Sequence, residues 1–180
     1  MHHLTLIVGI AAIVAPSLHL LSDVMEWSAG GFSRAQPLVN YAAFVPMPFL
    51  LLGLYALQTP RSTWVGLLGA MLYGLAFVYF THSTLVALEQ SIPNYEILWG
   101  RLGVVYTVYG AMIIAGGLLF GLDALRARVL PRRGVILFLT GIGLNLVVGL
   151  TPLPDIVQIA GSTIRNVGLM AIGAGVVLSS

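Results

Sequence analysis

The chain has 180 residues, of which 58% are hydrophobic and only 8% are charged, a composition that excludes an ordinary soluble domain and is typical of membrane proteins. Its net charge is +2, but most of its eight Arg lie in short segments between apolar runs, so we expect no nucleic-acid partner. The absence of Cys excludes disulfides, a thiolate nucleophile and Cys-ligated metal centres.

Six apolar runs are long enough to cross a hydrocarbon core of about 30 Å at a rise of about 1.5 Å per residue. In chain order they are Leu4–Leu21, Pro37–Leu57, Thr63–Leu88, Ile97–Leu122, Gly134–Leu153 and Ile156–Val177. We therefore predict an all-α membrane protein, a six-transmembrane-helix bundle that forms a single integral membrane domain over residues 1–180. The first run is expected to be retained, because Met1-His2-His3 lacks the basic residues of a signal peptide.

The distribution of Arg predicts the orientation of the bundle. The segment between the second and third runs contains Arg61, and the segment between the fourth and fifth contains four more Arg between Arg126 and Arg133. Lys and Arg in short loops favour the cytoplasmic side. We therefore expect both termini to be cytoplasmic, in a multi-pass protein of the plasma or inner cell membrane.

A weak internal similarity links the ends of the second and fourth runs. Leu50–Leu57 is similar to Leu118–Leu125, and a Pro-Arg pair and another apolar run follow each of them. The hairpins 37–88 and 97–153 are therefore possible duplicated units, as in transporters with parallel repeats.

His19, Asp23 and Glu26 are spaced i, i+4, i+7 and so lie on one face of the first helix near its outer end. Trp27 follows directly. A His between carboxylates suits proton transfer, so we predict these three residues as catalytic candidates and Trp27 as a substrate contact. The alternative is that both acids are solvated and Trp27 is an interfacial anchor.

His82 is the fourth catalytic candidate, with Glu89 seven residues later and Tyr79 one turn before it as candidate binding residues. The alternative is a neutral His that hydrogen-bonds a neighbour in the core. The spacing does not reproduce the Glu-x-x-His motif of carboxylate-bridged metal sites, so we predict no metal site.

The sixth run has one polar face, formed by Asp155, Gln158, Ser162 and Arg165, which we predict to bind substrate. An Arg near the middle of the membrane is unfavourable by at least about 2.5 kcal/mol on insertion scales, so it must face protein or a wet cavity. The alternative role for Arg165 is a structural lock to a carboxylate or to free carbonyl groups.

The fourth run adds further candidate binding residues. These are Trp99, Arg101, Tyr106 and Tyr109. The two tyrosines lie too deep for an interfacial belt, and their hydroxyl groups need partners inside the bundle. Together these patterns predict a polar, aromatic-lined pocket that opens toward the outer leaflet.

Three functions fit such a pocket. The first is an intramembrane enzyme that acts on a lipophilic molecule by acid–base chemistry, of the isomerase or cyclase type. The second is a substrate-binding or transport subunit, in which Arg101 and Arg165 would suit a carboxylate-bearing ligand. The third is a small electron-transfer subunit with His19 and His82 as ligands of haem b.

The second alternative has a counterpart in a known family. Six spans, inside termini, an outward polar site and the Ala11-x-x-x-Ala15 spacing resemble the general plan of the substrate-binding components of energy-coupling-factor importers. The resemblance is one of architecture and implies solute binding, and no binding residue is carried over from it.

Among these functions we favour the enzyme and predict no required cofactor. The expected partners are membrane lipid and a small lipophilic ligand. A second copy of the chain or another membrane subunit is left open.

Overall fold

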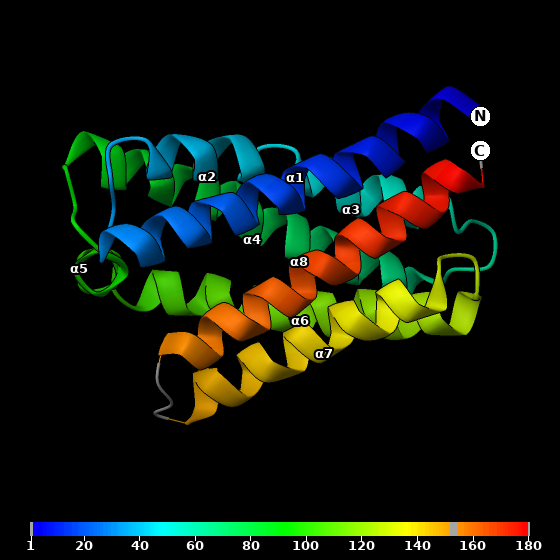
Figure 1. Cartoon of the computed structure of the whole chain (residues 1–180). Coiled ribbons are helices and arrows are strands. Elements are labelled where there is room, and N and C mark those ends of the chain that lie inside the picture. Colours follow the sequence, from blue (N-terminus) through cyan, green and yellow to red (C-terminus); the bar gives the residue numbers. More distant parts are fainter. Residues whose placement is uncertain (1, 152–154, 180) are drawn as a thin grey trace.

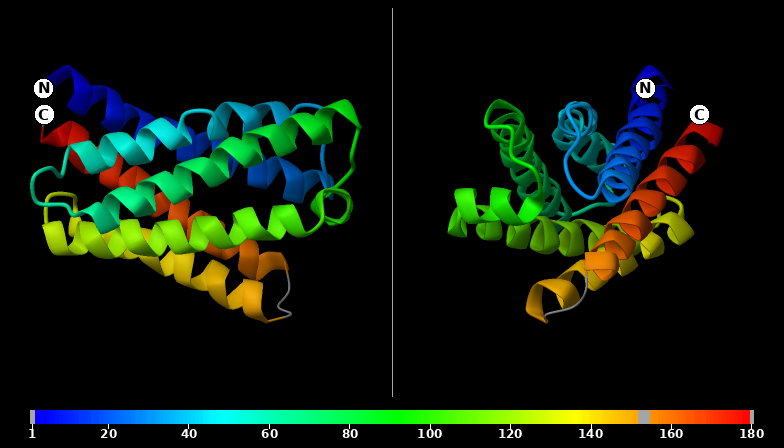
Figure 2. Two further views of the ribbon diagram at one scale, coloured as in Figure 1. Left: turned by 180° about the vertical axis from the view of Figure 1, so that it is seen from behind. Right: turned by 60° about the vertical axis from the view of Figure 1, so that its left-hand side comes forward.

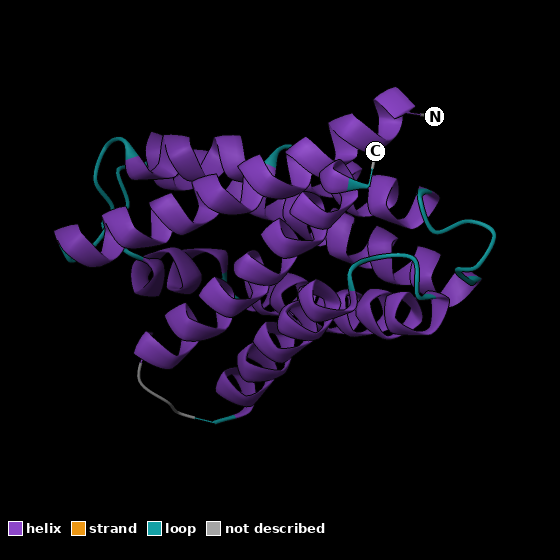
Figure 3. Cartoon of the chain, turned by 45° about the vertical axis from the view of Figure 1, so that its right-hand side comes forward, coloured by secondary structure: helices purple, strands orange, loops and turns teal. Residues whose placement is uncertain are grey.

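The computed structural model describes residues 2–151 and 155–179 (Figure 1). The described residues form helices joined by loops and turns, with no strand among them (Figure 3). The elements are α1 (His2–Ala29), α2 (Gln36–Phe44), α3 (Met47–Ala56), α4 (Trp64–Glu89), α5 (Tyr95–Leu102), α6 (Val104–Ala127), α7 (Arg132–Leu150) and α8 (Asp155–Leu178).

Six segments of the described chain are long and apolar enough to cross a membrane, with α2 and α3 together forming the second of them. Large apolar side chains such as Ile7, Phe49 and Val104 are 65–76% exposed on the outside of the bundle. A continuous apolar exterior of this kind fits lipid rather than water. The prediction of an all-α, six-transmembrane-helix bundle is confirmed.

Proline interrupts the second span. Helix α2 ends at Phe44 and α3 begins at Met47, with Pro46 between them and Pro48 in the first turn of α3. Proline has no N–H to donate to the carbonyl four residues earlier, and its ring collides with that carbonyl, so the helix breaks here. The break lets Pro48 pack closely against Gly74 of α4.

The fourth run was predicted as one helix over Ile97–Leu122, and this boundary is wrong. Gly103 adopts φ +62° and separates α5 from α6. Glycine reaches this left-handed region without steric penalty, so the chain turns sharply there. Helix α5 is seen end-on in Figure 1 while its neighbours are seen from the side, so it lies across the end of the bundle.

The six spans form a ring in which each packs against its neighbours in the sequence, and α8 closes the ring against α1. Close approach at glycines brings the helices together. A Cβ at Gly69 of α4 would collide with the backbone of α6, and one at Gly173 of α8 would collide with the backbone of α1. Small residues at crossing points are the usual basis of helix packing in membranes.

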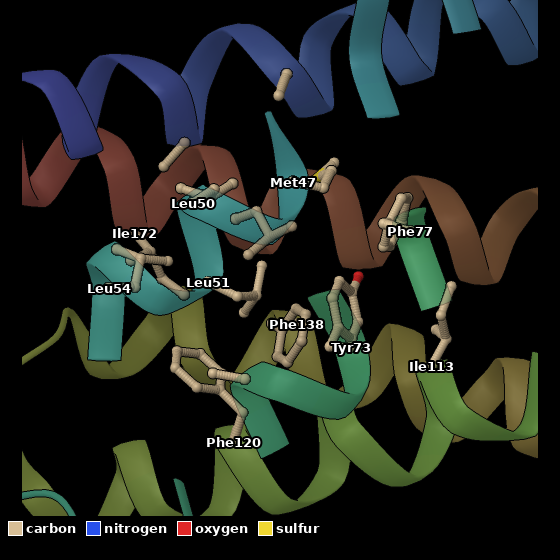
Figure 4. Packing of buried hydrophobic residues seen from close by; sticks show 14 of the residues in the cluster. Met47, Leu50, Leu51, Leu54, Tyr73, Phe77, Ile113, Phe120, Phe138 and Ile172 are labelled. Atoms are coloured by element: carbon tan, nitrogen blue, oxygen red, sulfur yellow. The ribbon is translucent and has the colours of Figure 1, made fainter. Parts of the chain in front are cut away.

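The centre of the ring is filled by aromatic and aliphatic side chains (Figure 4). Phe138 of α7 lies between Tyr73 of α4, at 5.9 Å between ring centroids, and Phe120 of α6, at 6.2 Å. Leu51 and Ile172 complete this layer from α3 and α8. The core therefore joins spans from both halves of the chain.

Both termini lie at the same end of the bundle (Figures 1 and 2). The loops that contain Arg61 and the run Arg126–Arg133 lie at this end too, whereas α5 and the α1–α2 loop lie at the opposite end. The two ends thus differ in charge as the sequence predicted. Which end faces the cytoplasm stays a prediction, and so does the duplication of 37–88 and 97–153.

Candidate functional site

Helices α1 and α8 bring four of the predicted site residues together. The hydroxyl of Ser162 donates to Oδ2 of Asp23 at 2.8 Å. Nε2 of His19 lies 3.7 Å from Oδ1 of Asp23, and Nδ1 of His19 lies 3.5 Å from a terminal nitrogen of Arg165. We call His19, Asp23, Ser162 and Arg165 the α1–α8 polar cluster.

His19 is held by aromatic rings as well as by charges. Its ring meets Phe44 of α2 edge-on at 4.8 Å and Phe77 of α4 at 6.4 Å, and only 7% of the residue is exposed. Because Arg165 can only donate, Nδ1 of His19 accepts and Nε2 carries the proton toward Asp23. The imidazole thus lies between the guanidinium and the carboxylate.

Few polar contacts offset the cost of burying the charge of Arg165. It is 5% exposed, and no carboxylate in the described part of the chain lies within ion-pair distance of it. Its Nε has no hydrogen-bond partner. A structural lock to a carboxylate, the alternative considered above, is therefore absent among the described residues.

Two further polar side chains that sequence reasoning missed lie near this cluster. Asn166 is fully buried and faces His19, although neither of its amide atoms makes a hydrogen bond of good geometry. The hydroxyl of Tyr73 is also buried and unpartnered. Buried polar groups are nearly always paired in native proteins, so unpaired groups gathered in one place indicate a site that takes up water or another polar group. Asn166 is spaced i, i+4 from Ser162, a signal that the sequence contained.

A groove on the outside of the bundle reaches the α1–α8 polar cluster. It has a volume of about 360 Å³ and is lined by Leu20, Asp23, Val24, Trp27, Ile159 and Thr163. Most of its lining is apolar, and it lies between α1 and α8. Asp23 is therefore both a wall of this groove and a member of the cluster behind it.

A second layer of polar contacts lies closer to the end of the bundle that carries α5. Gln36 donates to the hydroxyl of Ser22 at 3.0 Å, and Asn40 donates to the hydroxyl of Tyr95 at 3.2 Å. Phe32 meets the ring of Tyr95 edge-on at 4.8 Å. Burial raises the pKa of Tyr95 well above its usual value, so its hydroxyl keeps its proton.

Glu26, Tyr106 and Asp23 all lie close enough to Tyr95 for their charges to raise its pKa further, so this layer adjoins the α1–α8 polar cluster. Glu26 is half-buried on α1, and Tyr106 packs edge-on against Phe80 of α4 at 5.0 Å. These two predicted site residues thus lie near Tyr95.

Tyr79, His82 and Tyr109 lie on α4 and α6, away from the two helices that form the cluster. Tyr79 and Tyr109 stack at 4.1 Å with an angle of 5° between their rings, and His82 is exposed beside Tyr79 at 6.5 Å. The side chains of Glu89, Trp99, Arg101 and Gln158 are exposed. The side chain of Asp155 lies outside the described residues. No contact in the described part of the chain joins His82 to His19 or Asp23.

Within the described residues, no group of three or more His, Asp or Glu side chains is placed to hold a metal ion. Both ring nitrogens of His19 face protein side chains, and His82 is on α4 with its ring exposed. This placement offers no support for the haem alternative.

The fold and the cluster define a polytopic helical membrane protein with a buried charged cluster between two of its spans. The chain matches no protein-family model, and comparison with curated proteins and with solved structures found no match. The function is therefore argued from the side chains themselves.

Proposed function

We propose that the protein is an intramembrane acid–base enzyme, of the isomerase type, that acts on a lipophilic small molecule entering from the bilayer. The proposal rests on the location of Asp23, which belongs both to the groove lining and to the α1–α8 polar cluster. Its carboxyl group lines an apolar groove and also contacts Ser162 and His19 behind the groove. A proton-transfer group must reach its substrate while other groups hold it in place.

In this mechanism Asp23 is the catalytic residue. As an acid it donates its proton to one carbon of a double bond, whose electron pair forms the new C–H bond and leaves the other carbon positively charged. The resulting carboxylate takes a proton from the next carbon, and that electron pair becomes the shifted double bond. Net composition does not change. Ser162 orients the carboxyl group through its hydrogen bond, and the Nε2–H of His19 faces the other oxygen at 3.7 Å. Asp23 exchanges its proton with solvent between turnovers.

Arg165 is a positioning residue in this scheme. It contacts His19 rather than the groove, and its charge fixes which nitrogen of the imidazole carries the proton. The indole of Trp27 and the apolar side chains of Leu20, Val24 and Ile159 exclude water from the reacting carbon.

Solvent exchange tests the proposal even while the substrate is unidentified. The protein in lipid nanodiscs is incubated in ²H₂O with lipids extracted from its native membrane, and the lipids are then analysed by mass spectrometry. We expect one lipid species to gain deuterium with the wild-type protein and not with Asp23→Asn. Glu96→Gln is the matched control, because this exposed carboxylate lies at the same end of the bundle, on α5.

The result also separates the enzyme from the binding or transport alternative. A protein that only binds its ligand returns it with unchanged isotopic composition. Equal deuterium uptake with the wild-type and Asp23→Asn proteins, or uptake with neither, would contradict the enzyme proposal.

A further inference from the structure

We propose that the groove between α1 and α8 binds lipophilic cations, with an ammonium group against Asp23 and Trp27 and an alkyl or isoprenoid chain along the groove. The inference deepens the proposed function, because it uses the same groove and names the charge of the group that the groove selects. The binding it describes does not depend on the chemical step.

The shape of the groove fits one chain. Its volume of about 360 Å³ is near the lower limit of small-molecule sites, which hold roughly 300–1,000 Å³. Leu20, Val24 and Ile159 provide apolar walls. The groove lies on the outside of a span pair, so a chain can enter it from the bilayer without crossing water.

In its ionised form, Asp23 gives the groove a negative charge that favours a cation. Among the described residues that line it, Asp23 is the only ionisable one, whereas Arg165 lies behind His19 and does not line the groove. A carboxylate can accept about four hydrogen bonds. Asp23 receives a short one from Ser162 and has a longer contact with His19, so it retains acceptor capacity for a ligand.

Trp27 adds a second feature that suits a cation. It is spaced i, i+4 from Asp23, lines the same groove and is 70% exposed. A cation over an indole face is attracted by about 0.5–2 kcal/mol, more where water is excluded. A carboxylate beside an indole therefore suits an alkylammonium group, which the carboxylate attracts by its charge and the indole by its ring face.

The same preference follows from the proposed chemistry. When Asp23 has delivered its proton to a double bond, the substrate carbon is positively charged and Asp23 is a carboxylate. An ammonium ion on a similar chain carries the same charge at the same place. We therefore expect lipophilic ammonium ions to bind more tightly than neutral analogues and to inhibit turnover.

Binding is tested with a single-tryptophan protein. Trp64→Phe with Trp99→Phe leaves Trp27 as the only tryptophan of the chain. The protein in phosphatidylcholine nanodiscs is titrated with dodecylammonium, dodecanol or dodecanoate, each below its micelle concentration or solubility limit, and the fluorescence of Trp27 is followed. We expect saturable binding of the ammonium at least tenfold tighter than that of the alcohol, with dodecanoate the weakest.

Three variants make the test decisive. Asp23→Asn should remove the preference for the ammonium over the alcohol, whereas Glu96→Gln should preserve it. Ile159→Trp keeps the charge but fills the groove, so it should weaken the binding of all three ligands. Because this replacement adds an indole, its binding is followed by the displacement of a radiolabelled ammonium. Thermal unfolding in detergent checks that each variant is folded.

Equal affinity for the ammonium and the alcohol, or a preference that survives Asp23→Asn, would overturn the inference. Tightest binding of dodecanoate would also overturn it and would assign an anion to Arg165. The titration needs no turnover, so a failure of the deuterium experiment leaves it unaffected. A failed titration likewise leaves the exchange result standing.

Discussion

The hydroxyl of Ser162 donates a hydrogen bond of 2.8 Å to Asp23 across 139 positions of the chain. This bond joins α8, the last span, to α1, the first. It also fixes one oxygen of the carboxyl group that lines the groove. The orientation of Asp23 therefore depends on how the last span packs against the first.

Replacing Ser162 tests this dependence. Ser162→Ala removes the hydrogen bond, and interhelical hydrogen bonds in membranes contribute on average about 0.6 kcal/mol, so we expect a small decrease in the unfolding temperature. Deuterium exchange should fall much more, because Asp23 loses its orientation. Thr140→Ala is the control, since that hydroxyl donates to the carbonyl of Ile136 in its own helix. A Ser162→Ala protein with unchanged exchange would contradict the role given to this bond.

Arg165 is the residue for which structural and catalytic roles predict opposite results. Arg165→Met should leave the unfolding temperature in detergent nearly unchanged, because the replacement removes a buried charge that has no ion-pair partner in the described chain. Arg165→Lys keeps the charge but loses the planar guanidinium that faces His19, so exchange activity should fall.

Both Arg165 variants are measured for unfolding temperature and for deuterium exchange. An unstable Met variant together with a fully active Lys variant would show that Arg165 only stabilises the fold, and we would then remove it from the site.

Close packing at Gly141 predicts a large effect of a small change. A Cβ at Gly141 of α7 would overlap the backbone of Arg165 on α8. Gly141→Ala should therefore force the two helices apart and destabilise the protein by about 1–3 kcal/mol, the usual range for overpacking. It should also displace Arg165 from His19. Unfolding temperature and exchange activity are both measured.

Gly143 provides the matched control on the same helix, because no atom lies within 4 Å of the Cβ that Gly143→Ala would add. That variant should be as stable as the wild type, or more stable by up to about 1 kcal/mol, since alanine favours helix over glycine. Equal stability of the two variants would contradict the packing argument.

The orientation of the bundle is tested by labelling introduced thiols in a chain that has no Cys. Ser28→Cys and Ser179→Cys are exposed, nearly isosteric replacements at opposite ends of the bundle. We expect a membrane-impermeant maleimide added outside intact cells to label Cys at position 28 and not at position 179, because the Arg-rich end is expected inside. The reverse labelling pattern would contradict this orientation and would place the groove in the inner leaflet.

The six spans were predictable because each depends on properties that are local in the sequence. An apolar run of about 20 residues must pair its own backbone groups in a membrane, which only a helix does within one segment. The pairing of His19 with Asp23 was predictable for the same reason, since residues four apart on a helix are neighbours. The break at Gly103 was missed because α5 is itself partly apolar and continues the hydrophobic run.

Contacts between helices were decided only by the tertiary structure. The sequence placed Ser162 and Arg165 on one face of the last span, but only the packing of α8 against α1 brings that face to Asp23 and His19. The rotation of α4 in the ring leaves His82 exposed while it buries Tyr73. The helical period determines which residues share one face of a helix. The helix that packs against this face depends on where glycines let two backbones approach, as Gly141 of α7 does for Arg165 of α8.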